Sequence, residues 1–317
     1  MKNITIIGTG YVGLVTGVGL SEFGNNVICA DIDEDKIFQL KSGKIPIYEP
    51  GLDEIIQRNV KSERLHFSDD ISSSMQNSEV IIIAVGTPQT SRGNANLTYV
   101  NSVVEVVKQN LKDYKIICTK STVPIGTGEE IIKTLSNDFE EGIDFDYVSN
   151  PEFLREGSAV KDFLWPDRVI IGTKSDKAYK IMCDIYRPLY INKNPIKHTT
   201  VETAEMIKYA SNSFLALKIS YINEIANLCE TLGADIHDVA SAMGQDGRIS
   251  DKFLHPGPGF GGSCFPKDLE SLIAISNEKN IPMETLNAAK KANDNQKAKM
   301  GTKLEKLINA NLKDKKI

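Results

Sequence analysis

The chain has 317 residues, a net charge of −5, and 41% hydrophobic and 25% charged residues, which together indicate a globular protein of two domains. This acidic balance provides no basic surface for nucleic acid, and the longest apolar runs are far too short to cross a membrane. The five cysteines form no Cys-x-x-Cys pair, and the first predicted strand begins too close to Met1 for a signal peptide, so we expect a cytoplasmic protein without disulfides or a metal site.

The first thirty residues have the pattern of a dinucleotide-binding unit. An apolar strand is predicted over residues 3–7, followed by a helix and by a second strand over residues 27–30 that ends at Asp31. The turn after the first strand reads Gly8-Thr9-Gly10-Tyr11-Val12-Gly13, and its glycines permit a tight bend and a close approach of pyrophosphate to the helix N-terminus. Asp31 would accept hydrogen bonds from ribose hydroxyls and would repel a 2′-phosphate, so NAD is predicted rather than NADP.

Strands and helices continue to alternate until about residue 195, which predicts an α/β fold with a doubly wound parallel sheet. Further strands are predicted over residues 80–85, 115–119 and 147–149. Polar residues at the carboxyl ends of such strands face the crevice in which these sheets bind ligands. Thr87 and Thr122 are therefore candidate ligand contacts, although each is equally suited to cap a helix.

One long helix is predicted from Val201 to Leu232, because an apolar pattern runs through this segment without Gly or Pro until Gly233. At 1.5 Å per residue this helix would be about 45 Å long. Helices of such length usually span domains or form oligomer interfaces, so we expect a homodimer. Lys208 and Asn212 lie four residues apart on it and project from one face, and their spacing alone favours a solvated face over a ligand site.

The segment Gly-Phe-Gly-Gly-Ser-Cys-Phe-Pro-Lys-Asp at 259–268 carries the most specific chemical signal. Pro266 suits the first turn of a helix, so Cys264 would lie at a helix N-terminus, where the partial positive charge favours the thiolate. Asp268 follows four residues later on the same side of that turn, which pairs a nucleophile with an acid or base. The alternative interpretation is a small cysteine packed in a tight turn, as Cys29 and Cys118 are expected to pack in the core.

These motifs and others resemble the UDP-glucose/GDP-mannose dehydrogenase family, in order, from residue 1 to about 300. The matching segments are Gly-Thr-Gly-Tyr-Val-Gly (8–13), Glu-Pro-Gly-Leu (49–52), Val-Gly-Thr-Pro (85–88), Ser-Thr-Val-Pro-Ile-Gly-Thr (121–127), Asn-Pro-Glu-Phe-Leu-Arg-Glu-Gly (150–157), the helix of Lys208 and Asn212, Asp-Gly-Arg-Ile (246–249) and the cysteine segment (259–268). The resemblance implies a Rossmann-like NAD-binding domain over residues 1–197. It also implies an all-α dimerisation domain with a long central helix over 198–297, and the start of a linker to a third domain over 298–317.

The resemblance further implies a four-electron oxidation that uses two NAD in succession and converts the C6 hydroxymethyl group of a nucleotide sugar to a carboxylate. Asp268, with a water held by Thr122, would remove the hydroxyl proton. The Cys264 thiolate would attack the resulting aldehyde, and Lys208 and Asn212 would stabilise the oxyanion of the thiohemiacetal. Glu152 would take part in acid–base or water-activating steps when the later thioester is hydrolysed.

Binding residues are implied in the same way. The cofactor contacts implied beyond the glycine turn are Asp31, Lys36, Thr87, Thr122, Glu156 and Lys267, with Glu156 meeting the nicotinamide. The implied substrate contacts are Glu152, Phe153, Leu154, Lys208, Asn212, Phe253, Gly261 and Arg248, of which Arg248 would reach the site of the partner subunit.

Two segments bear on the choice of substrate within the family. Asp246-Gly-Arg-Ile and Ser263-Cys264-Phe265 favour UDP-glucose over GDP-mannose or a UDP-N-acetylhexosamine. Family members usually continue into a third domain that binds the uridine diphosphate, whereas this sequence stops at Ile317. If the chain is complete, we expect it to bind NAD and dimerise but to turn over nucleotide sugar poorly; a non-catalytic NAD-binding dimerisation module is the alternative outside the enzymes.

Overall fold

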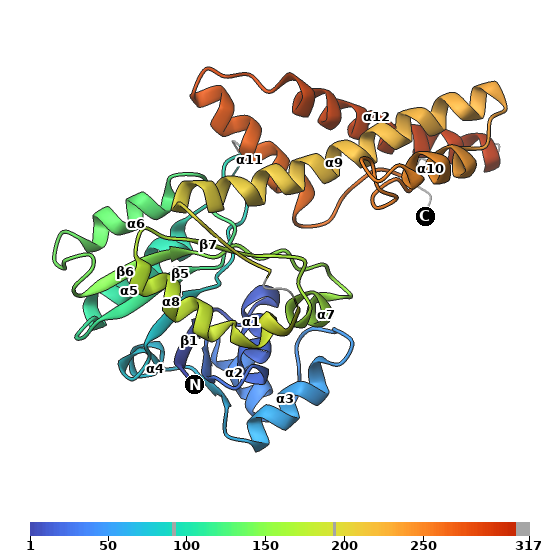
Figure 1. Cartoon of the computed structure of the whole chain (residues 1–317). Helices are drawn as coiled ribbons and strands as arrows, with labels where there is room; N and C mark the ends of the chain where they lie inside the picture. Colours follow the sequence, from blue (N-terminus) through green and yellow to red (C-terminus); the bar gives the residue numbers. More distant parts are fainter. Residues whose placement is uncertain (91–92, 193–194, 309–317) are drawn as a thin grey trace. The chain divides into compact units, whose positions relative to one another are not determined.

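The computed structural model describes residues 1–90, 93–192 and 195–308 (Figure 1). The chain divides into two compact units, the first comprising Met1–Pro88 and Ala95–Lys208, and the second Gln89–Asn94 and Tyr209–Ile317. The segment 298–317, predicted as a linker, begins inside a helix that runs to Ile308, and its residues 309–317 lie outside the described part.

The first unit is built on one eight-stranded sheet of order β3-β2-β1-β4-β5-β6-β7-β8. Its strands are β1 (Asn3–Ile7), β2 (Asn26–Ala30), β3 (Leu65–Ser68), β4 (Val80–Ile83), β5 (Lys115–Thr119), β6 (Phe145–Ser149), β7 (Val169–Gly172) and β8 (Ile196–Thr199). The first six strands are parallel and follow the 3-2-1-4-5-6 order of a doubly wound dinucleotide fold, so the predicted fold class is confirmed. The sheet reverses once, because β7 pairs with β6 in the antiparallel direction.

Both faces of this sheet are buried, as the alternation of side chains along β4 shows. Val80 and Ile82 belong to one hydrophobic cluster, whereas Ile81 and Ile83 belong to a second. The first cluster is completed by residues of α1 (Tyr11–Glu22), α2 (Glu34–Lys41), α3 (Leu52–Lys61), α7 (Ala159–Leu164), α8 (Asp176–Ile185) and η1 (Arg187–Asn192). The second cluster is completed by residues of α4 (Ile71–Gln76), α5 (Thr98–Asn110) and α6 (Thr127–Leu135).

The second unit consists of the short segment Gln89–Asn94 and of the helical part of the chain that begins at Tyr209. Its helices are α9 (Val201–Leu232), whose first two turns belong to the first unit, α10 (Ile236–Gln245), α11 (Phe265–Glu278) and α12 (Glu284–Ile308). The bounds of α9 confirm the predicted long helix. Side-chain hydrogen bonds join α9 to α12: the Ser220 hydroxyl donates to the Ala289 carbonyl oxygen at 2.9 Å, and the Asn227 amide donates to Gln296 at 2.8 Å. In the described ranges, no helix is both long and apolar enough to cross a membrane.

A buried carboxylate in the first unit makes the stability of this fold depend on pH. Glu205, near the start of α9, accepts hydrogen bonds from the backbone N–H groups of Gly126 and Gly128, at 2.7 and 2.8 Å, where α6 begins. Burial outweighs these bonds and raises the pKa of Glu205 to about 7. Folding raises the pKa of such an acid because the folded state favours the protonated form. Its contribution to the stability of the folded state is fully present below the unfolded pKa, and it is lost as the pH rises through the folded pKa.

We therefore expect the stability of the parent, compared with that of Glu205→Gln, to fall by up to about 3 kcal/mol between about pH 4.5 and pH 7. The free energy of unfolding in urea, measured for both proteins across this interval, gives the difference directly. Glu79→Gln, which alters an exposed partner of Lys2, serves as the control and should show a much smaller trend. A difference between parent and Glu205→Gln that does not vary with pH would contradict the expectation.

Candidate active site

The predicted cofactor turn connects β1 to α1 and requires its glycines for steric reasons. Gly8 has φ +102°, and a Cβ there would lie 2.7 Å from the Ala84 carbonyl oxygen. A Cβ on Gly13 would lie 1.8 Å from the Gly8 carbonyl oxygen, so only glycine allows the helix to pack this closely. Gly10 caps α1 without a side chain, so the first N–H groups of the helix, beginning at Tyr11 and Val12, are available to an anion.

Asp31 lies beside this turn, directly after β2. Its Oδ2 accepts hydrogen bonds from the backbone N–H and the hydroxyl of Thr9, both at 2.7 Å, and from Lys36 Nζ at 3.2 Å. Its Oδ1 accepts from the Asp33 N–H at 3.1 Å. Burial opposes ionisation, but these hydrogen bonds and the charge of Lys36 outweigh it and lower the pKa of Asp31. An ionised carboxylate thus lies next to the glycine turn, as recognition of a ribose diol requires.

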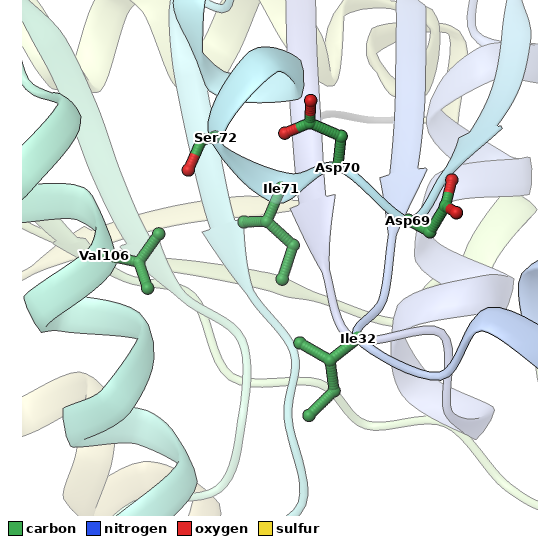
Figure 2. Close-up of a pocket in the computed structure, with 6 residues that line it drawn as sticks. All are labelled: Ile32, Asp69, Asp70, Ile71, Ser72 and Val106. Carbon is green, nitrogen blue, oxygen red and sulfur yellow. The ribbon is translucent and has the colours of Figure 1, made fainter.

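A surface pocket of about 460 Å³ lies at Ile32, the residue after Asp31, and no sequence motif predicts it (Figure 2). Ile32 contributes an apolar side chain that is 78% exposed. An apolar residue directly after the acidic end of a strand is a signal that could have identified it. The other contributors follow β3 or lie on α5, and they meet only because of the strand order. The pocket is lined by Ile32, Asp69, Asp70, Ile71, Ser72 and Val106.

The loops after β4 and β5 are joined by the two predicted threonines. The Thr87 hydroxyl donates to the Thr122 carbonyl oxygen at 2.9 Å. A second bond, from the Ser121 hydroxyl to the Val85 carbonyl oxygen at 2.7 Å, fixes the same two loops. Both threonines thus lie at the carboxyl edge of the sheet, where ligands of doubly wound folds bind.

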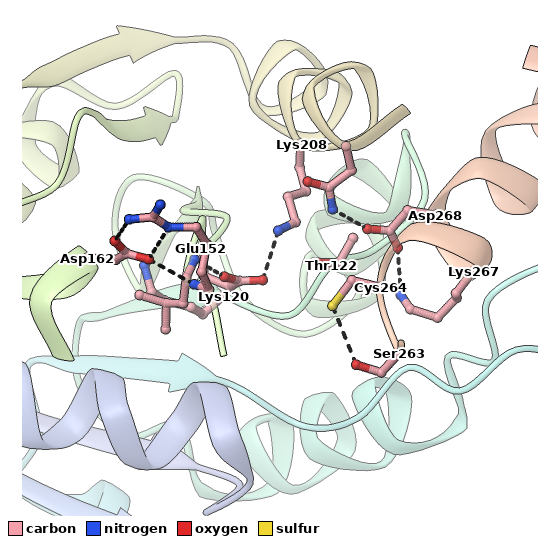
Figure 3. A network of polar contacts seen from close by, with 12 residues as sticks. Lys120, Thr122, Glu152, Asp162, Lys208, Ser263, Cys264, Lys267 and Asp268 are labelled. Carbon is pink, nitrogen blue, oxygen red and sulfur yellow. Dashed lines mark hydrogen bonds and ion pairs between the residues drawn. The ribbon is translucent and has the colours of Figure 1, made fainter. Parts of the chain in front are cut away.

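After β6, the structure brings together Glu152 and Lys208 (Figure 3). Phe153 lies close to Lys208. Lys208 Nζ donates to Glu152 Oε1 at 2.8 Å, and Glu152 Oε2 accepts from the Leu154 N–H at 2.5 Å. Two cations lie near the Phe153 ring, with Lys208 Nζ 5.4 Å and Arg168 Cζ 3.9 Å from its centroid. The Lys208 side chain is only 5% exposed, so the solvated face that its spacing favoured is wrong.

In the second unit, Asp268 is enclosed by donors near the start of α11 (Figure 3). Asn212 Nδ2 donates to Asp268 Oδ2 at 2.6 Å, and Lys267 Nζ lies 2.8 Å from Asp268 Oδ1. Asp268 is 1% exposed, so its carboxylate depends on these two protein donors rather than on solvent.

Cys264 is the N-cap residue of α11, as the sequence predicts, and its side chain is exposed. The alternative of a packed, enclosed cysteine is therefore wrong for Cys264, whereas Cys29 and Cys118 are fully buried as predicted. Cys264 Sγ lies 3.6 Å from the Ser263 hydroxyl, and the Cys264 carbonyl oxygen accepts from the Asp268 N–H at 2.9 Å. This places an accessible thiol one helical turn before a buried carboxylate.

The remaining predicted residues are less enclosed. Arg248 is exposed and pairs with Asp246 at 2.5 Å, whereas Glu156 and Gly261 lie in exposed loops. Phe253 has φ +66° and packs edge to face against Phe265, with ring centroids 6.0 Å apart. Across the described ranges, no cluster of three or more His, Cys, Asp or Glu side chains could hold a metal ion.

Comparison with known proteins gives the family. The model of the NAD-binding domain of the UDP-glucose/GDP-mannose dehydrogenase family matches residues 2–190, and that of its central domain matches residues 202–295. The curated UDP-glucose 6-dehydrogenase of Rhizobium meliloti (strain 1021) is 48% identical over 317 residues, which cover 99% of this chain and 72% of the relative. UDP-glucose 6-dehydrogenase TuaD of Bacillus subtilis (strain 168) is 48% identical over 304 residues, which cover 96% of this chain and 65% of the relative.

A solved structure agrees with these relatives. The UDP-glucose dehydrogenase from the hyperthermophilic archaeon Pyrobaculum islandicum has a TM-score of 0.92 and 36% sequence identity, over 98% of this chain and 72% of that one. The cofactor turn, the ionised Asp31 and the pocket at Ile32 fit a dinucleotide. The matched NAD-binding domain identifies that cofactor as NAD. The chain therefore belongs to the UDP-glucose/GDP-mannose dehydrogenase family.

Proposed function

We propose that this protein oxidises the C6 hydroxymethyl group of UDP-glucose to a carboxylate, giving UDP-glucuronate. The observation that carries the proposal is the arrangement at the start of α11, where an exposed Cys264 thiol precedes the buried Asp268 carboxylate by one turn. A nucleophile and a base are the groups that an alcohol oxidation through a covalent intermediate requires. The names of the relatives and of the solved structure support the choice of UDP-glucose.

Asp268 acts as the base of the first oxidation. Its carboxylate is held in place by Asn212 and Lys267, and it accepts the proton of the C6 hydroxyl, directly or through a water held by Thr122. Bound NAD supplies the hydride acceptor for each of the two oxidations. The product of this step is an aldehyde.

Cys264 retains that aldehyde on the protein. Its thiolate forms a carbon–sulfur bond to C6, and the carbonyl oxygen becomes the oxyanion of a thiohemiacetal. Lys208 and Asn212, four residues apart on α9, supply the donors for that oxyanion. The second oxidation converts the thiohemiacetal to a thioester. Glu152 then takes a proton from water, which adds its oxygen to C6 and releases the Cys264 thiolate and the carboxylate product.

We assign the pocket beside Asp31 to the adenine of the cofactor. An adenine ring needs an apolar surface next to the residue that binds its ribose, and Ile32 offers one directly after Asp31. Lys36, which pairs with Asp31 at 3.2 Å, helps to hold that carboxylate in position. The phosphates would lie on the first N–H groups of α1.

The test is an incubation of the protein with NAD and, in parallel, UDP-glucose, GDP-mannose or UDP-N-acetylglucosamine. We expect NADH to form with UDP-glucose and intact-mass analysis to show a sugar nucleotide attached at Cys264. NADH formation with one of the other sugars alone would transfer the assignment to that substrate. NAD binding without NADH formation from any of them would indicate a non-catalytic NAD-binding module.

We further propose a homodimer formed through α9. Phe214, Tyr221 and Leu228 recur every seven residues and therefore lie on one face of the helix, yet they are 59%, 49% and 55% exposed. A row of large exposed apolar side chains on one face is typical of a protein interface. These residues support α9 as the surface that meets a second copy of the chain.

Leu228→Glu is expected to convert the dimer to monomers, because two unpaired carboxylates would be buried in the interface. The dissociation constant should rise on the order of a hundredfold. Sedimentation velocity over a range of protein concentrations measures the change. Tyr99→Glu, which alters a similarly exposed aromatic residue on α5, is the control and should remain dimeric. A Leu228→Glu variant that dimerises like the parent would place the interface elsewhere.

A further inference from the structure

The Glu-Pro-Gly-Leu motif at residues 49–52 plays no part in the chemistry proposed above, yet its first residue is an enclosed carboxylate. Glu49 is 4% exposed and lies in the connection between α2 and α3. A carboxylate buried to this degree is costly unless strong donors satisfy it. Its donors come from two distant parts of the chain.

The first donor belongs to the cofactor turn. The hydroxyl of Tyr11, the first residue of α1, donates to Glu49 Oε1, and it also lies 3.2 Å from the Arg155 carbonyl oxygen. Burial, together with the hydrogen bond to Glu49 and its negative charge, raises the pKa of Tyr11. The Tyr11 hydroxyl therefore keeps its proton at neutral pH and acts as a constant donor.

The other donors belong to the segment that follows Glu152 and Phe153. The Gly157 N–H donates to Glu49 Oε1 at 2.5 Å, and the Ala159 N–H donates to Glu49 Oε2 at 3.0 Å. Both carboxylate oxygens are thus used, one by the turn before α7 and the other by the first residue of that helix. Glu49 is the acceptor shared by the cofactor turn and the end of the Asn-Pro-Glu-Phe-Leu-Arg-Glu-Gly motif.

We propose that Glu49 is a positioning residue for NAD binding and for the oxidation. Its carboxylate holds the Tyr11 end of α1 and the 155–159 turn in one fixed arrangement, so that the cofactor turn and the Glu152 segment are already placed when the dinucleotide arrives. Ordering these groups in advance removes part of the entropy cost of binding. The effect on oxidation rests on the proposed function, whereas the effect on NAD binding does not.

Two physical effects predict opposite results when the charge of Glu49 is removed. If charge alone mattered, a neutral residue near the pyrophosphate-binding helix end would tighten binding of the anionic dinucleotide. If positioning dominates, Glu49→Gln weakens binding, because its amide nitrogen cannot accept a hydrogen bond and would face a backbone N–H instead. The sign of the change in affinity therefore separates the two effects.

The experiment is a fluorescence titration of NADH into four proteins: the parent, Glu49→Gln, Tyr11→Phe and the double variant. We expect each single variant to raise the NADH dissociation constant on the order of tenfold, because each removes a hydrogen bond to a charged group. We expect the double variant to be little weaker than either single variant, since both changes disturb the same set of hydrogen bonds around Glu49. Tyr11→Phe removes only a hydroxyl group and keeps the test decisive if Glu49→Gln does not fold.

A matched control exists in the same unit. The Tyr114 hydroxyl donates to Asp146 Oδ2 at 2.5 Å, and the same oxygen accepts from the Ser175 hydroxyl at 2.6 Å. Asp146 is 2% exposed and lies near the amino end of β6, at the opposite edge of the sheet from the cofactor turn. Asp146→Asn and Tyr114→Phe therefore make the same kind of change, and we expect them to leave the NADH dissociation constant unaltered.

Steady-state kinetics with UDP-glucose provide a second readout. For Glu49→Gln we expect kcat to fall and KM for NAD to rise, with a smaller change in KM for UDP-glucose. NADH binding by Glu49→Gln that equals or exceeds that of the parent, or full additivity with Tyr11→Phe, would overturn the proposal. If the parent itself fails to oxidise UDP-glucose, the proposed function fails, while the NADH titration still decides the role of Glu49.

Discussion

Cys264→Ser is expected to abolish the release of uronate while leaving NAD binding unchanged. A serine hydroxyl at the same helix N-terminus is almost entirely un-ionised at neutral pH, so it cannot form the thioester through which the second oxidation is proposed to pass. We expect product formation to fall by a factor on the order of 10³ or more. Because Cys264 is exposed, the substitution should change the free energy of unfolding by less than about 0.5 kcal/mol. The loss of uronate formation would then come from the missing thiolate and not from unfolding.

The measurement is chromatographic quantification of UDP-glucuronate alongside NADH, with unfolding in urea as the check on stability. Cys183→Ser is the matched control, because Cys183 is the other free cysteine that is not fully buried among the described residues. It lies on α8 in the first unit and should retain the parent rate. Release of uronate by Cys264→Ser at the parent rate would exclude the covalent route.

The elements that the sequence predicts well are those specified by neighbouring residues. β1, α1 and β2 follow from a short apolar run, a glycine turn and a second apolar run, all within about thirty residues, and the absence of Gly and Pro before Gly233 predicts α9. The reversal at β7 was not predicted. β7 joins β6 through the single pair Ser149 and Gly172, and a strand of the same composition could run in either direction, so the direction depends on tertiary packing.

The candidate site shows a similar division. The sequence identifies Cys264 because its environment, a glycine segment followed by Pro266, is local. It could not reveal that Lys208 is buried, because the partner Glu152 is 56 residues away and spacing on a helix says nothing about what packs against it. Glu49 was visible only as part of a recognised motif, since its donors lie 38 and 108 residues away in the chain.

Lys208→Met is expected to destabilise the protein by about 3 to 5 kcal/mol, because it leaves the Glu152 carboxylate buried without its cation. Glu152 is 7% exposed and would keep only the Leu154 N–H as a donor among the contacts described above. Adding Glu152→Gln to Lys208→Met removes the uncompensated charge, so we expect the double variant to recover most of the lost stability. Unfolding in urea of the parent, both single variants and the double variant measures these changes.

Activity should follow a different course from stability in the same four proteins. Loss of the Lys208 ammonium removes a proposed oxyanion donor, so kcat should fall on the order of a hundredfold or more in Lys208→Met and should not recover in the double variant. Lys174→Met, which breaks an exposed pair with Glu129, is the control and should cost less than about 1 kcal/mol without affecting kcat. Equal destabilisation by Lys208→Met and Lys174→Met would show that the buried pair has no special structural role. Recovery of kcat together with stability in the double variant, which lacks both side chains, would show that neither Lys208 nor Glu152 takes a direct part in the reaction.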